Sequence, residues 1–191
     1  MNVARIPGML FTPAAGWTDV LVSRPPAIRL MHCVFGPAAM LPPLMIVLAS
    51  DTLGRQLLPQ ASLVTWFVIA FIVLVIEYAA LPLMTWLIMA VAQAHGGYPD
   101  AYRAFTLAVF APIPIWLASI TLPSANSMLI LGALLVGAAA STALVRHGTR
   151  ALLAVQEPEE AGYTAFTVLC AGAGIWAAFI AMVLIPAVVV R

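Results

Sequence analysis

Five long apolar stretches, separated by short connections, dominate this sequence and leave few folds open to it. A helix needs about 20 mostly apolar residues to cross the hydrocarbon core of a bilayer. The apolar stretches lie at residues 30–50, 62–93, 104–121, 127–145 and 164–189. Each is continuously apolar rather than alternating, which excludes a membrane β-barrel. The sequence therefore predicts an all-α, polytopic integral membrane protein with five transmembrane helices.

The composition excludes a water-soluble domain. Hydrophobic residues make up 64% of the chain and charged residues 8%, whereas a soluble domain carries about 25% charged residues. The net charge is +1, so no overall field favours nucleic acid as a partner, and the expected partner is the lipid bilayer. Cys33 and Cys170 fall inside apolar stretches without disulfide or zinc spacing, and we expect both to be small buried residues.

The placement of arginine predicts the orientation of the chain. With the amino terminus inside, the cytoplasmic segments are 1–29, 94–103 and 146–163, and they hold Arg5, Arg24, Arg29, Arg103, Arg146 and Arg150. The outer side then holds only Arg55 and Arg191. Because positive residues concentrate on the cytoplasmic side, we expect the amino terminus inside and the carboxyl terminus outside.

The chain divides into an amino-terminal segment, 1–29, and a five-helix domain, 30–191. Residues 1–29 contain too few consecutive apolar residues to form a span, but they also contain few charged residues. A short helix starting near Pro13 would place Trp17 and Leu21 on one stripe. We expect this helix to lie in the inner membrane interface, with Trp17 as an anchor at headgroup depth. A disordered polar tail is the alternative.

Glu77 is the one charged residue in the stretch 62–93, about 23 Å along a helix from Ser62 and near mid-depth. A carboxylate at the centre of a bilayer costs about 2.5–3.5 kcal/mol, so it is not expected to face lipid in its ionised form. A protonated Glu77 could donate to a carbonyl freed by Pro112 or Pro114, that of Ala108 or Phe110. Alternatively it could face a wet cavity and bind a cation or proton, with Pro112 and Pro114 lining the path. Glu77, Pro112 and Pro114 are therefore the candidate intramembrane functional site.

Small residues at four-residue spacing mark two candidate packing faces, because helices in a bilayer associate through close contact at such residues. One face comprises Ala133, Gly137 and Ser141, and the other comprises Cys170, Gly174 and Ala178. We expect these faces to meet each other or the second span, with a homodimer seam as the alternative. Prolines in the first and third spans predict kinks there.

The sequence contains no phosphate loop, dinucleotide-binding glycine pattern, HExxH or GxSxG motif. His32 and Cys33 are adjacent, but neighbouring residues on a helix point about 100° apart, which makes a shared metal awkward. We therefore expect no enzymatic activity, no cofactor and no metal site.

Three stretches resemble bacterial members of the Yip1 domain family, which are small five-span membrane proteins. They are GMLFTPAAGWTDVLVSRP (8–25), AHGGYPDAYRAFTLAVFAPIPIWL (94–117), and the order of a glycine-rich span, the stretch ALLAVQEPEEAGYTAF and a final apolar span. The resemblance implies a five-helix fold in the bacterial inner membrane, with a cytoplasmic amino terminus and a periplasmic carboxyl terminus. It brings no catalytic residue, and the Asp-Leu-Tyr-Gly-Pro motif of the eukaryotic relatives is absent.

Three functions are compatible with these features. The first is a non-enzymatic membrane scaffold or accessory protein that binds a protein partner, lipid or itself. The second is a small transporter or channel for a proton, metal ion or lipid that uses Glu77. The third is a membrane-shaping role for the amino-terminal helix. Because transport usually needs more polar groups at depth than one carboxylate, the first is favoured.

Overall fold

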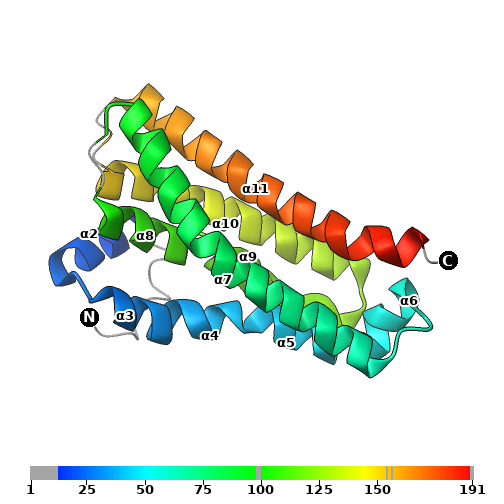
Figure 1. The fold of residues 1–191 in the computed structure, drawn as a ribbon. Helices are drawn as coiled ribbons and strands as arrows, with labels where there is room; N and C mark the ends of the chain where they lie inside the picture. Colours follow the sequence, from blue (N-terminus) through cyan, green and yellow to red (C-terminus); the bar gives the residue numbers. More distant parts are fainter. Residues whose placement is uncertain (1–12, 98–99, 154, 156, 190–191) are drawn as a thin grey trace.

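The computed structural model describes residues 13–97, 100–153, 155 and 157–189 of the chain. These residues are predominantly helical and form no strand. Long helical segments lie side by side along one direction, with a short helix at one end of the bundle (Figure 1). In chain order the elements are α2 (Pro13–Ser23), α3 (Ala27–Leu30), η2 (Met31–Phe35), α4 (Gly36–Ala39), α5 (Leu41–Leu48), η3 (Ser50–Gly54), α6 (Arg55–Leu57), α7 (Leu63–Ala94), α8 (Ala101–Phe110), α9 (Ile113–Ala118), η4 (Ser119–Ser124), α10 (Ser127–Leu153) and α11 (Pro158–Val189).

Four helical segments in the described part of the chain are long and apolar enough to cross a membrane. They run Ala27–Leu48, Leu63–Ala94, Ala101–Ser124 and Ser127–Leu153. The predicted all-helical membrane class is thereby confirmed, together with the first four apolar stretches as helices. Helix α11 covers the fifth stretch.

The first and third of these segments are built from pieces, whereas α7 and α10 are continuous. The first contains a π-helix, η2, and a turn at Met40, and the third contains a turn at residues 111–112 followed by a 3₁₀-helix, η4. Both interruptions lie beside prolines, which remove a backbone donor and clash with the preceding turn. The two interrupted segments also pack against each other, α5 on η4 and α4 on α9. The predicted disturbance of these two spans at their prolines is confirmed.

The connections predicted to share one side of the membrane do lie at one end of the bundle. Helix α2, the end of α7, the start of α8 and the start of α11 lie together, while α6 lies at the opposite end (Figure 1). Contacts between these segments support the view: Arg24 pairs with Asp100, and His95 with Glu160. Arg5 and Arg191, which entered the count of arginines, lie outside the described residues.

The long connection predicted at 146–163 is mostly helical. Helix α10 continues to Leu153, because Thr149 and Leu152 extend its buried stripe beyond the apolar stretch. Helix α11 begins at Pro158, and Glu159 and Glu160 occupy its first turn, where the helix dipole favours negative charge. The bundle therefore extends two turns beyond the part that the apolar pattern marks.

Candidate functional site

Glu77 faces the interior of the bundle. It belongs to the stripe of α7 that also buries Val73, Leu81 and Ile88, at helical spacing. The side chain is 8% exposed, whereas its neighbours Val75 and Tyr78 are 49% and 40% exposed. A lipid-facing carboxylate is thus excluded by the register of the helix, as the sequence predicted.

Aromatic side chains from three elements contact one another near this position. Phe35 of η2 lies edge-on to Tyr78 at 5.2 Å between ring centroids and edge-on to Trp116 of α9 at 5.3 Å. The hydroxyl of Tyr78 lies near the backbone of Gly36, where a Cβ would be 3.3 Å from it. Edge-to-face packing of this kind is favourable for aromatic rings. Glu77 therefore lies beside an aromatic cluster, to which Trp116 belongs.

The carboxyl group of Glu77 has no hydrogen bond within the described residues. Both of its oxygens and the indole Nε1 of Trp116 are buried and unpaired. The indole of Trp116 lies close to the carboxyl of Glu77, but the two groups do not have the geometry of a hydrogen bond. Of the two alternatives for Glu77, the hydrogen bond to the carbonyl of Ala108 or Phe110 is not formed.

Pro112 and Pro114 occupy different structural positions in the third span. Pro112 is half-buried at the turn that interrupts the third span, whereas Pro114 is buried in the first turn of α9. The carbonyl of Pro114 faces α10, where it would lie 2.8 Å from a Cβ added at Gly137. Pro114 therefore contributes to helix packing, and it is Trp116, two residues on, that reaches Glu77.

The two small-residue faces do not pair as predicted. Gly137 and Ser141 are buried, and Gly137 packs against α9, where a Cβ would meet the Pro114 carbonyl and the Cα of Ile115. Prolines interrupt the third span and leave backbone there to which a glycine can pack closely. This explains why Gly137 packs against α9. On α11, Cys170 and Gly174 are exposed, and nothing lies within 4 Å of a Cβ added at Gly174.

Helix α11 instead packs on α7 and α10 through a face that includes Ala161, Thr164, Ala165 and Val168. Ala178 belongs to α11, but its side chain lies outside those described. The expectation that both cysteines are buried is also wrong, since Cys33 and Cys170 are exposed on the bundle surface.

Trp17 is fully buried, not exposed at a membrane surface. Helix α2 begins at Pro13, and Trp17 packs edge-on against Phe110 at 5.6 Å between ring centroids. A Cβ at Gly148 of α10 would lie 3.1 Å from the Trp17 ring. The indole therefore anchors α2 to α8 and α10, and our expectation of contact with lipid headgroups is wrong for this side chain.

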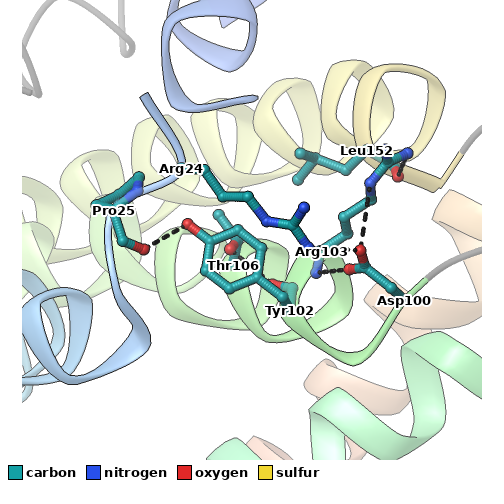
Figure 2. A network of polar contacts seen from close by, with 7 residues as sticks. All are labelled: Arg24, Pro25, Asp100, Tyr102, Arg103, Thr106 and Leu152. Atoms are coloured by element: carbon teal, nitrogen blue, oxygen red, sulfur yellow. Dashed lines mark hydrogen bonds and ion pairs between the residues drawn. The ribbon is translucent and has the colours of Figure 1, made fainter. Parts of the chain in front are cut away.

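A polar network at the same end joins three segments that are far apart in sequence (Figure 2). Tyr102 donates from its hydroxyl to the Pro25 carbonyl at 2.7 Å, and Arg24 pairs with Asp100 at 3.1 Å. Figure 2 shows the Arg24 side chain beside the Tyr102 ring, with 5.3 Å from its Cζ to the ring centroid. Arg103 donates to the Leu152 carbonyl at 3.3 Å. The network ties the segment after α2 to α8 and to the end of α10.

Asp100 also begins α8, because its carboxylate accepts from the backbone N–H of Arg103 at 2.7 Å. Aspartate before an apolar helical run is a normal N-cap, so this role could have been predicted from the sequence. Its pairing with Arg24 could not, because nothing in local spacing relates residues 76 positions apart.

A second contact closes the same end between α7 and α11. The Nδ1 of His95 lies in hydrogen-bond contact with the Glu160 carboxylate, and the His95 ring stacks on Tyr163 at 6.5 Å between centroids. His32 and His147 instead contact the carbonyls four residues earlier, Ile28 and Ala143. No group of three potential metal ligands occurs among the described residues.

No protein-family model, curated protein or solved structure matches this chain.

Proposed function

We propose that the chain is a non-enzymatic scaffold or accessory protein of the Yip1-like type in the bacterial inner membrane. In this proposal it has five spans, a cytoplasmic amino terminus and a periplasmic carboxyl terminus, and it binds a protein partner at its cytoplasmic end. Helix α11 is the fifth span, since residues 164–189 carry no charged residue and about 20 apolar residues suffice.

One observation carries the docking role: the loops at one end of the bundle are fixed to one another. Arg24, Asp100, Tyr102 and Arg103 join the amino-terminal segment, α8 and α10. Exposed ion pairs contribute little to stability individually. The bond from Tyr102 to Pro25 and the cap at Asp100 nevertheless hold a defined loop arrangement, and a preorganised surface loses less entropy on binding a partner.

Photo-crosslinking in native membranes tests the proposal. A photoreactive residue is placed at Gln93 or Glu159, which are exposed at the network end, and at Leu135, which is exposed on α10. We expect one discrete protein adduct from the first two positions, lost when Arg103→Ala removes its contact with Leu152, and none from Leu135. Adducts of lipid size alone at all three positions would contradict protein docking.

A transporter or channel for a proton or ion is the second candidate, favoured by one observation. The buried carboxyl of Glu77 has no hydrogen-bond partner in the described part of the chain, and it lies beside Trp116 of the interrupted third span. Broken helices with a polar group at mid-depth are typical of transport sites. In this candidate, proton or cation flux into liposomes requires Glu77 and is abolished by Glu77→Gln, with Tyr78→Phe as the control. Flux equal to that of empty vesicles would exclude it.

A further inference from the structure

Two arginines on α10 form no ion pair with any residue that the structure describes. Arg24 and Arg103 pair with Asp100, and Arg55 pairs with Asp51. Arg146 and Arg150 are both exposed, and neither forms an ion pair with a described residue. Their spacing of four residues places them on one side of the helix, with their Cβ atoms about 6 Å apart. Two adjacent guanidinium groups are thus open to an external anion.

The same side of α10 is apolar below these arginines. Leu135, Val136 and Ala139 are exposed along it, and Ala143 is half-buried. From Val136 to Arg146 the helix covers about 15 Å, which is half of a hydrocarbon core of about 30 Å. Val136 is the midpoint of the apolar stretch 127–145. With this residue at mid-depth, the pair lies where one leaflet ends and its phosphate groups begin.

The neighbouring protein groups leave this pair open. Between the two arginines, Gly148 points the other way and packs against Trp17 of α2, which fixes the rotation of α10. Asp19 of α2 is exposed and has a contact of its own. Helix α10 ends at Leu153, so its dipole favours a positive residue in the last turn and accounts for Arg150. It does not account for Arg146, one turn earlier.

We propose that Arg146 and Arg150 bind the phosphate of one anionic phospholipid whose acyl chains lie along the stripe from Val136 to Ala143. Guanidinium groups bind phosphate oxygens through paired N–H donors, which suits arginine better than lysine. The site rests on the membrane embedding of the proposed scaffold but not on its protein docking, and it adds a lipid class that the docking role does not specify.

Native mass spectrometry of the full chain in mild detergent tests this site. Phosphatidylglycerol is titrated against the wild type, and phosphatidylcholine is titrated in parallel. We expect Arg146→Gln with Arg150→Gln to weaken phosphatidylglycerol binding roughly ten- to thirtyfold, given the attraction of two basic residues to an anionic lipid. Binding of phosphatidylcholine should not change.

Arg29→Gln is the matched control, because Arg29 is exposed in the last turn of α3 at the same end and forms no ion pair with a described residue. It should change the affinity less than twofold. An equal loss in Arg29→Gln, or wild-type affinity in the double variant, would overturn the site. Competition by soluble glycerol phosphate at equal concentration would indicate a free-phosphate site and would overturn the lipid assignment.

Arg146→Lys with Arg150→Lys keeps the charge and serves if the glutamine variant does not fold. It should bind several-fold more weakly than the wild type, because lysine lacks the planar fork. Unchanged affinity in this variant would contradict recognition by paired guanidinium donors. If the wild type crosslinks at Gln93 but does not prefer phosphatidylglycerol, only the lipid site is removed. If it prefers phosphatidylglycerol but gives no protein crosslink at Gln93, only the docking role is removed.

Discussion

At the residue scale, Glu77 poses the sharpest energetic question in the bundle. An unpaired polar group buried away from water costs about 1–3 kcal/mol, and an ionised one costs more. Both oxygens of Glu77 are buried without a hydrogen bond to any described residue. In the scaffold role this carboxyl has no function, so it only lowers the stability of the protein. In the transport role it is the group that binds the proton or ion.

Glu77→Met removes that unpaired carboxyl and keeps a side chain of similar length. If the group is as isolated as the structure has it, the variant should be more stable by about 1–3 kcal/mol. The midpoint of thermal unfolding in detergent, followed by circular dichroism, measures this change. A lower midpoint for Glu77→Met would mean that the carboxyl has a stabilising partner, such as a bound cation.

Gly137 and Gly174 form a matched pair, since both belong to predicted small-residue faces but only one is packed. A Cβ at Gly137 would lie 2.8 Å from the Pro114 carbonyl oxygen, whereas a Cβ at Gly174 meets nothing within 4 Å. Gly137→Ala should therefore destabilise the protein by about 1–3 kcal/mol through overpacking. Gly174→Ala should be neutral or stabilising by up to about 1 kcal/mol, because alanine favours helix. Thermal unfolding compares the two, and a larger loss in Gly174→Ala would contradict the packing.

At the element scale, the attachment of α2 depends on one side chain. Trp17 contributes a fully buried ring between Phe110 and Gly148. Trp17→Ala should cost about 3–5 kcal/mol at this contact, enough to release α2 from the bundle. Limited proteolysis should then cleave between α2 and α3 at least tenfold faster, while Val22→Ala, at a position 83% exposed, should not change the rate. Equal cleavage of Trp17→Ala and the wild type would show that other contacts hold α2.

The elements themselves were largely predictable, because the apolar stretches and prolines are local signals. The four spans differ from their predicted bounds by a few residues, except that α10 extends to Leu153. Partner choice was not predictable: the spacing of Gly137 and Ser141 identified a packing face, but not that α9 would fill it. Trp17 shows the same limit, since an aromatic residue in a short amphipathic helix suits an interface and a bundle equally well.

At the scale of the whole molecule, the pattern of arginines and the three-dimensional grouping of loops agree. Arg24, Arg103 and the carboxyl end of α10 come together, as a chain that crosses back and forth requires. Sequence could assign these loops to one side because each span reverses the direction of the chain. It could not reveal that they form one polar network, since that depends on contacts between segments far apart in sequence.

Cysteine labelling in intact cells tests the proposed orientation. Single cysteines replace Gln56, at the α6 end, and Glu157, at the network end, in a background where Cys33 and Cys170 are alanine; both positions are exposed. Six of the eight arginines lie in the segments proposed as cytoplasmic. Loops that carry arginine are not readily translocated across the membrane. A membrane-impermeant maleimide should therefore label Gln56→Cys from outside and leave Glu157→Cys unlabelled until the cells are opened. Labelling of Glu157→Cys alone would invert the protein in the membrane, and equal labelling of both would place the two ends of the bundle on the same side and remove the membrane-spanning arrangement.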